Sequence, residues 1–485
     1  MFMKKLISAM MALTLVLTCF AGCGKKVRDT STLAMYTENY SVTKSMLTYC
    51  FNSQYLSFVT ANRENLEAYG LDTTQPLDKQ ECPLNNANWY DYFMDVAKSR
   101  LEQCLIVAEK ATADGKKLSE AEEKAIEAEL EVLKSEAKKK KLNLADYIEK
   151  TYGDGVTSDD LISVTRMEKL VNKYYDKFEK KLDTSEKAVT KYFEGHKRLY
   201  STVDYLSFYI TPLGDSMQES SAAQRAAMTL SESKTPEEFL EFVGDYITDY
   251  YTNYYGVKLS KKEIKEKVNE TKDNCAIKGA GYDPTSAASR WAFDNNRIVN
   301  EGTYIEDSEN GGYAVYFLTS LPTREEYNSV NIRQIVFDIA DFGSEDEALQ
   351  AAQKAILNLE LNEYSPAYFK KLSEEYSADA FSKANGGLYE NVTKGNLVNA
   401  EELEEWIFDA SRKNGDITLL QTDEYGYHVV YIEKIGEPVW LLRSREGMVN
   451  ARFSEYISDM GDDYVVYMND NVIYSVSEAE IETAE

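Results

Sequence analysis

Apolar residues recur at helical spacing over the first part of the chain. The clearest helix is predicted over residues 89–113, where apolar positions repeat every three or four residues and Asn88 can cap the start. Ser119 and Glu122 have the spacing of a capping box, which predicts that a second, charged helix begins there. The other predicted helices cover residues 144–152, 159–182 and 187–196. The pattern therefore predicts a mainly helical domain over residues 33–200.

Beyond this domain the pattern changes to alternation. Apolar and polar residues alternate over residues 203–210, which predicts a strand directly after the helical domain. Residues 439–460 are amphipathic, and the alternation of residues 464–476 predicts another strand. Residues 477–485 are acidic, and we expect them to fray as a tail.

A pair of sequence blocks occurs twice in the second half of the chain. Residues 235–239 (Thr-Pro-Glu-Glu-Phe) match 365–369 (Ser-Pro-Ala-Tyr-Phe), and residues 291–294 (Trp-Ala-Phe-Asp) match 406–409 (Trp-Ile-Phe-Asp). The first copy carries extra residues between its two blocks, in the polar region 251–284. Short aromatic motifs can also recur by chance, but their order, their spacing and the shared Pro-x-x-Phe favour an internal repeat.

We interpret the repeat as two tandem units, residues 201–322 and 328–437, each a small antiparallel sheet covered by helices. Two motifs of the second unit resemble a parvulin-type (rotamase) prolyl isomerase domain. Residues 376–387 read Tyr-Ser-Ala-Asp-Ala-Phe-Ser-Lys-Ala-Asn-Gly-Gly, and residues 425–432 read Tyr-Gly-Tyr-His-Val-Val-Tyr-Ile. In that family the first motif is a loop with an acidic or thiol residue after a helix. The second motif is a strand that carries a histidine.

The end of the helical region carries a further resemblance. Residues 184–193 read Thr-Ser-Glu-Lys-Ala-Val-Thr-Lys-Tyr-Phe, and a series of helices ending in this way resembles the N-terminal chaperone domain of PrsA- and SurA-like foldases. In those proteins the segment after the last parvulin unit folds back on the N-terminal helices. The resemblance implies an α+β fold. A helical N-terminal chaperone domain (33–200) is completed by the C-terminal segment 438–476, and two parvulin-like domains lie between them.

The resemblance also implies which residues form the site of the second unit. The family places two hydrogen-bonded histidines beside an Asp or Cys, and the corresponding positions hold Gln334, His428 and Asp379. A glutamine can donate and accept hydrogen bonds, but it cannot offer the tautomer switching of a histidine pair. The glutamine therefore implies reduced isomerase activity.

Three apolar residues are implied around the proline ring of a substrate. Leu397 matches the family's pocket methionine, and Leu403, which precedes Phe408, matches its pocket phenylalanine. The pocket then stays apolar but loses its aromatic wall. Rotation of an X–Pro bond requires no nucleophile, metal or cofactor, so we expect neither a metal nor a cofactor.

The first unit departs further from the family. Ser207 stands at the first histidine position and Ala314 at the second, and only Asp249 persists. We therefore predict that this unit is a non-catalytic binding or spacer module. His196 lies on a charged helix end and is expected to be a surface residue.

The formal net charge of −28 over 485 residues narrows the choice of partners. It argues against nucleic acid and against an electrostatic attraction to anionic lipid. It fits a protein that stays apart from its neighbours or one that attracts cations or basic polypeptides.

The N-terminus predicts the compartment. Lys4 and Lys5 precede an apolar run over residues 6–20 that is short for a membrane span. The run ends in Phe-Ala-Gly-Cys at Cys23, which resembles a bacterial lipobox. We predict a signal peptide over residues 1–22, a lipid on Cys23 and a tether over 23–32, which would leave the protein anchored to the membrane and facing outward. An ordinary signal peptide with a chance cysteine is the alternative.

The remaining cysteines are Cys50, Cys82, Cys104 and Cys275. Their spacing matches no zinc pattern, and the chain holds only 2 histidines. A disulfide can form in an exported protein, and buried thiols are the other interpretation.

The sequence leaves three functions open. The first is a lipid-anchored foldase for newly exported or unfolded polypeptides, whose second parvulin unit isomerises X–Pro bonds. The second is a holdase in which both units only bind extended chain. The third is an adaptor lipoprotein with a fixed partner. The sequence leaves a homodimer open.

Overall fold

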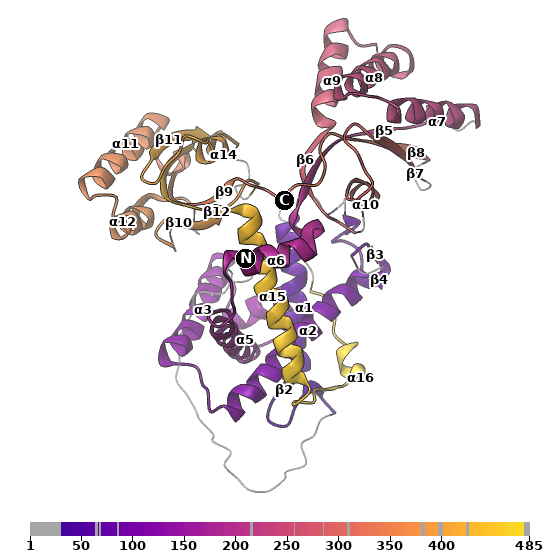
Figure 1. The fold of residues 1–485 in the computed structure, drawn as a ribbon. Coiled ribbons are helices and arrows are strands. Elements are labelled where there is room, and N and C mark those ends of the chain that lie inside the picture. The colour runs from indigo at the N-terminus through magenta and orange to yellow at the C-terminus, as the bar shows by residue number, and fades with distance from the viewer. Residues whose placement is uncertain are drawn as a thin grey trace. The chain divides into compact units, whose positions relative to one another are not determined.

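The computed structural model describes residues 31–479 with short gaps at 64–65, 67–68, 85–86, 214–216, 257, 285, 308–310, 380–382, 384, 396–400 and 423–425. The chain folds into two compact units (Figure 1). One unit comprises the chain up to Thr184 together with the segment from Val449, and the other comprises Ser185–Met448. The helix α6 (Glu186–His196), expected at the end of the helical domain, therefore groups with the sheets.

Five helices form most of the first unit. Asn88 caps α2, and Ser119 forms a capping box with Glu122 at the start of α3, as the sequence predicts. Thr43 caps α1 in the same way. The bounds of these helices are α1 Lys44–Ala61, α2 Trp89–Ala113, α3 Glu120–Lys139, α4 Leu144–Tyr152 and α5 Ser158–Glu179. A two-stranded ribbon of β3 (Glu81–Cys82) and β4 (Ala87–Asn88) precedes α2.

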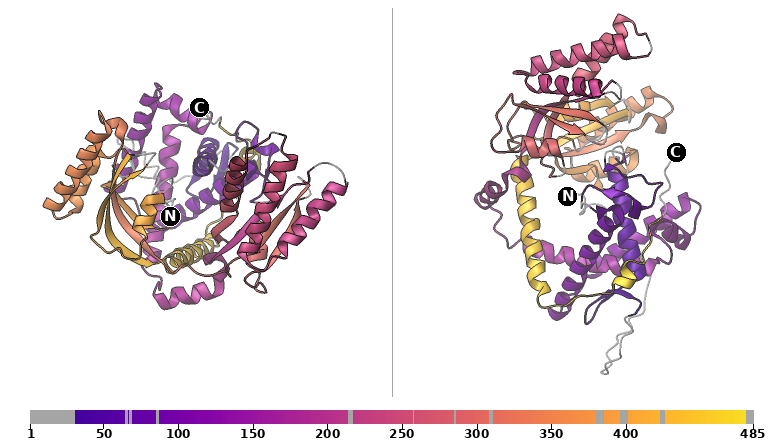
Figure 2. Two further views of the ribbon diagram at one scale, coloured as in Figure 1. Left: turned by 90° about the horizontal axis from the view of Figure 1, so that it is seen from above. Right: turned by 90° about the vertical axis from the view of Figure 1, so that its right-hand side faces the viewer.

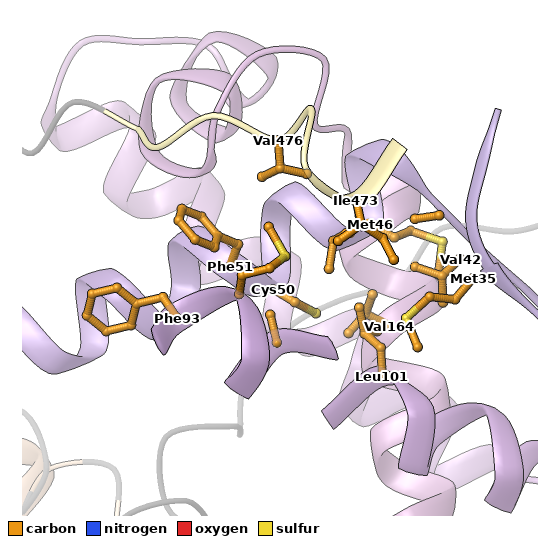
Figure 3. Close-up of a cluster of buried hydrophobic side chains, with 14 of the residues drawn as sticks. Met35, Val42, Met46, Cys50, Phe51, Phe93, Leu101, Val164, Ile473 and Val476 are labelled. Atoms are coloured by element: carbon orange, nitrogen blue, oxygen red, sulfur yellow. The ribbon is translucent and has the colours of Figure 1, made fainter. Parts of the chain in front are cut away.

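The C-terminal segment completes this helical unit. The strand β13 (Tyr467–Met468) pairs antiparallel with β1 (Leu33–Tyr36), which pairs in turn with β2 (Ser41–Thr43). Figure 3 shows Ile473 and Val476 reaching the cluster of buried side chains built by α1 and α2. The second half of α15 (Val439–Gly461) packs on α2 and α5 through Phe453, Ile457 and Met460.

The expected strand over residues 464–476 is wrong in extent, because only two of its residues are strand. Asn469 donates its N–H to the carbonyl of Ala34 at 2.9 Å, and the chain then turns into the short helix α16 (Asp470–Ile473). Burial of Ile473 and Val476 in the helical core outweighs the alternating pattern. The start of the expected frayed tail is also ordered, since the N–H of Ala479 donates to Asn52 Oδ1 at 2.8 Å.

The second unit contains two antiparallel sheets of four strands with the same strand order. The first has the order β6-β5-β8-β7 and the second the order β10-β9-β12-β11. The bounds in the first sheet are β5 Thr202–Ile210, β6 Ala276–Gly281, β7 Gly302–Asp307 and β8 Gly312–Leu318. The bounds in the second sheet are β9 Asn328–Phe337, β10 Leu388–Val392, β11 Ile417–Thr422 and β12 Gly426–Pro438. Together with the helices, these sheets confirm the predicted α+β class.

Each face of the second sheet has its own core. The helices α11 (Glu345–Leu361) and α12 (Pro366–Tyr376) cover the face that carries Ile335 and Val429, and the left view of Figure 2 shows α11 lying along this side. The shorter helix α14 (Glu401–Ile407) packs on the opposite face, on residues such as Ile332. Successive side chains in a strand point to opposite faces, so one strand serves both cores.

The first sheet repeats this arrangement with an insertion. The helices α7 (Met217–Ser231) and α8 (Pro236–Asp249) cover one face, and α10 (Ala287–Ala292) lies on the other. The extra residues predicted in the polar region 251–284 include the helix α9 (Lys261–Asn274), which precedes the edge strand β6.

The four cysteines of the described residues are all buried, and no disulfide joins them. The Sγ of Cys275 lies 3.2 Å from the carbonyl oxygen of Thr271, one helical turn earlier. Of the two interpretations that the sequence left open, the structure has the buried thiols.

Candidate active site

The two central strands of the second sheet bring Gln334 and His428 to one face. In the pairing of β9 with β12, Gln334 lies opposite Val430 and His428 lies opposite Val336. Residues that face each other, and residues two apart along a strand, point to the same side of a sheet. Gln334 and His428 are therefore diagonal neighbours, and both side chains are buried at 7% and 2% exposure.

His428 is held as a neutral imidazole. A hydrogen bond of 2.9 Å joins its Nε2 to the Oγ1 of Thr422, which lies at the end of β11. Burial lowers the pKa of His428 to about 4, although the nearby Asp379 carboxylate acts in the opposite direction. The imidazole is thus uncharged at neutral pH. The Asp379 carboxylate lies close enough to the His428 ring to interact with it.

A loop anchored to β9 carries Asp379. After α12 ends, the N–H of Val336 donates to Ser377 Oγ at 3.1 Å and the N–H of Ala378 donates to the carbonyl of Val336 at 2.8 Å. At the far end of the loop, the N–H of Gln334 donates to the carbonyl of Gly387 at 2.9 Å. The loop therefore continues the pairing of the edge strand and holds its carboxylate over the face with His428.

The Gly-Gly turn that closes this loop requires glycine. Gly387 has a φ of +79°, and a Cβ at this position would lie 2.8 Å from the carbonyl oxygen of Gln334. Gly386 has a φ of +62°, and its carbonyl accepts a hydrogen bond of 2.8 Å from the Arg333 guanidinium. A side chain at Gly387 would push the loop away from β9, and one at Gly386 would meet Lys370 of α12.

Tyr389 is the next polar residue on the same face. It lies opposite Ile332 in the pairing of β10 with β9, and Ile332 shares its face with Gln334. The Tyr389 hydroxyl donates a hydrogen bond to Asp379 Oδ2. Burial and the Asp379 carboxylate raise the pKa of Tyr389 well above its usual value, so the phenol keeps its proton.

The expected wall residues have different settings. Leu403 is buried at 1% exposure in the core beneath α14, so it supports the sheet face from within. Phe408 packs edge-on against Tyr327, with ring centroids 5.5 Å apart, and Lys394 Nζ lies 6.0 Å from its centroid. Leu397 lies outside the described residues. Their contact with a proline ring stays a prediction.

The structure brings Gln334, Asp379 and His428 together, and it adds two residues that sequence reasoning missed. Thr422 and Tyr389 have no motif of their own, and their roles follow from strand register. The sequence gives only an indirect signal for these two residues, because each lies beside a segment that a predicted motif identifies. Thr422 ends the strand that pairs with the histidine strand, and Tyr389 follows the Gly-Gly turn.

The same positions of the first sheet hold different residues. Ser207 lies opposite Tyr316 and Ala314 lies opposite Tyr209, so Ser207 and Ala314 occupy the places of Gln334 and His428. This register agrees with the correspondence drawn from the sequence. The first sheet therefore has no histidine at the position that corresponds to His428. As expected, His196 is exposed on α6, where its Nδ1 lies 2.8 Å from the carbonyl oxygen of Tyr192.

The expected persistence of Asp249 in the first site is wrong. Asp249 is the last residue of α8, is exposed, and accepts a hydrogen bond of 2.6 Å from Asn253 Nδ2. The chain continues from it into a π-helix, Tyr250–Tyr254, instead of turning along β5. The N–H of Ser207 pairs with the carbonyl of Cys275 at 2.8 Å, so the residues after α9 replace the loop. The sequence offset could not reveal this, because the insertion follows directly.

Comparison with known proteins supports the second sheet most directly. A family model described as a PPIC-type PPIase domain matches residues 316–435, which include β9, β10 and β11 and most of β12. No curated protein matches the chain. Within the described residues, no helix has the length and apolar character needed to cross a membrane.

Three solved structures are similar to the chain at low scores. The peptidylprolyl isomerase PrsA from Bacillus anthracis is 12% identical over 51% of this chain and 97% of that one, with a TM-score of 0.20. PrsA from Bacillus cereus is 13% identical over 56% and 90%, with a TM-score of 0.19. The foldase protein PrsA from Lactococcus lactis is 10% identical over 78% and 100%, with a TM-score of 0.19. The domain match at 316–435 and the site geometry therefore carry the functional assignment.

Proposed function

We propose that this protein, which contains a PPIC-type PPIase domain over residues 316–435, is a foldase that isomerises X–Pro bonds of unfolded polypeptides. The observation that carries the proposal is the pairing of the buried Gln334 and His428 on one sheet face with the half-buried Asp379 of the adjoining loop. Two buried polar side chains beside a carboxylate require a reason, because burying polar groups costs free energy. Binding and twisting an amide is the chemistry that this arrangement fits.

The site needs only to favour a twisted amide. The barrier to X–Pro rotation is about 20 kcal/mol and arises from amide resonance. Resonance places partial negative charge on the carbonyl oxygen, so the Asp379 carboxylate beside that oxygen would destabilise the planar form. The amide N–H groups of Gln334 can donate to the nitrogen lone pair that appears on twisting. The neutral His428, held by Thr422, excludes water from one side of the site and offers a further hydrogen-bonding nitrogen.

A protease-coupled assay on a proline-containing peptide tests this function. The intact protein is expected to accelerate isomerisation, and His428→Ala and Asp379→Ala are expected to remove most of that acceleration. A protease that cleaves only the trans isomer reports the rate directly. No acceleration by the intact chain would remove the isomerase from the proposal.

The cellular setting is part of the same proposal. We infer that a lipid on Cys23 anchors the protein outside the membrane, because Phe-Ala-Gly-Cys follows a short apolar run with two lysines before it. Cys23 itself lies outside the described residues. Mass spectrometry of the mature N-terminus tests the anchor. An unmodified residue 23, or cleavage elsewhere, would contradict it.

A holdase is the second candidate, and the first sheet favours it. Ser207 and Ala314 replace the polar pair there, and Gln334 weakens the pair in the second sheet. A holdase would suppress aggregation of an unfolded client without accelerating isomerisation. Failure in both assays would instead favour an adaptor with a fixed partner.

A further inference from the structure

We propose that Tyr389 is a positioning residue of this site, which acts by orienting the Asp379 carboxylate toward the substrate amide; this inference rests on the proposed isomerase function. No motif in the sequence points to Tyr389. Its position follows from the edge strand β10, where it lies opposite Ile332 and so shares the face of Gln334 and His428.

The backbone is anchored at both ends of the loop, but these anchors do not orient the carboxylate. Hydrogen bonds from Ala378 and to Gly387 anchor the loop to β9 at both ends. Neither bond involves the Asp379 side chain, whose rotamer is therefore set by its own contacts. The Tyr389 hydroxyl donates to Oδ2 and so fixes one of the two carboxylate oxygens.

Strand β9 anchors both partners of this bond. The N–H of Ala378, the residue before Asp379, donates to the carbonyl of Val336 on β9. The Gly386-Gly387 turn leads directly into β10, where Tyr389 is the second residue, and Gly387 lies against the backbone of Gln334. Contacts with the same strand therefore place Tyr389 and Asp379 within reach of each other.

The bond completes a polar row across the sheet. Tyr389 is on β10, Gln334 on β9, His428 on β12 and Thr422 on β11, which is the order of the four strands. Asp379 accepts from Tyr389 at one end of this row, and its charge acts on His428, the third residue of the row. The hydroxyl thus acts on the reaction through the carboxylate and need not touch the substrate.

A double-mutant cycle separates positioning from a general effect on folding. Tyr389→Phe removes only the hydroxyl, Asp379→Asn removes the charge, and the third variant combines them. If Tyr389 acts through Asp379, Tyr389→Phe lowers kcat about tenfold with KM nearly unchanged, as expected for a lost hydrogen bond to a charged group. The double variant is then no slower than Asp379→Asn alone.

The same domain provides a matched control. Tyr427 also donates its hydroxyl to a carboxylate, Glu345 Oε1, at 3.1 Å, but it lies on the opposite face of the sheet. Tyr427→Phe therefore removes an equivalent bond away from the site and is expected to leave kcat within twofold. A similar loss in both variants would mean that Tyr389 only stabilises the domain, and the proposal would be overturned.

An NMR experiment tests the bond without relying on activity. The Cζ signal of Tyr389 in carbon-13-labelled protein, assigned by its absence from Tyr389→Phe, should not titrate up to pH 11. In Asp379→Asn it should titrate at lower pH, because the adjacent charge is gone. A Tyr389 signal that titrates normally in the intact chain overturns the inference.

The activity results distinguish failure of this inference from failure of the proposed function. An active intact chain with an unaffected Tyr389→Phe variant overturns the role of Tyr389 and leaves the isomerase standing. An inactive intact chain removes the isomerase and this role together, even if the NMR experiment finds the bond.

Discussion

The two sheets of the second unit have the same strand order, but they differ in the segment that follows the second covering helix. Both have the same order of strands and the same pairing of the two central strands, so that Ser207 and Ala314 fall where Gln334 and His428 lie. In the second sheet, the loop after α12 turns along β9 and brings a carboxylate. In the first sheet, α8 continues past that point and the carboxylate stays on the helix.

The first sheet has a different tyrosine–carboxylate pair on this face. The Tyr209 hydroxyl donates to Asp307 Oδ2 at 3.0 Å, and Asp307 lies opposite Gly312, as Thr422 lies opposite Gly426. In the first sheet the carboxylate comes from the end of a strand, whereas in the second sheet it comes from a loop. The comparison teaches that the sheet fixes where side chains can meet, whereas the loop between the second helix and the edge strand decides whether a site forms.

The largest effect is expected from removing the turn that distinguishes the second sheet. Gly387→Ala places a Cβ 2.8 Å from a backbone oxygen at a φ of +79° and should destabilise the domain by about 2–4 kcal/mol and abolish activity. Gly395→Ala is the matched control, because Gly395 has the same φ of +79° with nothing within 4 Å. It should cost only about 1 kcal/mol. Equal losses in urea unfolding would show that the contact with β9 is unimportant.

The second prediction exchanges the central residues of the two sites. His428→Ala should lower kcat/KM about 100-fold, the size expected when a positioned polar group is lost from an active site. Ala314→His should give the first sheet no activity, because Asp249 does not reach that face. The protease-coupled assay measures both. Activity gained from Ala314→His in a His428→Ala background would contradict the emphasis on the loop.

The third prediction concerns pH and applies to the second sheet alone. The pKa of His428 is lowered from 6.5 to about 4 in the folded state, so between these values the unfolded chain binds a proton that the folded chain does not. Stability from the neutral His428 is present above pH 6.5 and is lost as the pH falls toward 4. At pH 5 the loss relative to pH 7 should be about 2 kcal/mol.

Urea unfolding at pH 7 and pH 5 measures this loss. The His428→Asn variant is the reference, because its pH dependence comes from the carboxylates and not from this histidine. The difference between the intact chain and this variant isolates the histidine. The same pH dependence in both proteins would mean that His428 is not buried as a neutral ring.

The smallest effect is expected from restoring the family's residue at position 334. Gln334→His should raise kcat/KM by a factor of about ten or less, since the rest of the polar row is already in place. The corresponding Ser207→His in the first sheet should change nothing measurable. A loss of activity in Gln334→His would show that the glutamine is adapted to this site and does not weaken it.

Much of the fold and part of the site could be predicted from the sequence because the signals are local. Capping boxes, helical spacing and a Gly-Gly turn depend on residues within a few positions of one another. The site residues Gln334, Asp379 and His428 were found by resemblance, and the register of β9 and β12 places Gln334 and His428 on one face. The burial of Leu403 was not predictable in this way, because it depends on the packing of α14 on the sheet.

The sequence by itself determined the helices of the first unit, the repeated blocks and the histidine-bearing strand, since periodicity and turn chemistry act over short stretches of chain. Tertiary structure alone decided that the chain stops being strand after Met468, that Asp249 stays on its helix, and that Tyr389 meets Asp379. Each of these depends on which distant backbone or core the segment reaches. Contacts across the sheet and burial in a shared core then outweigh local preference.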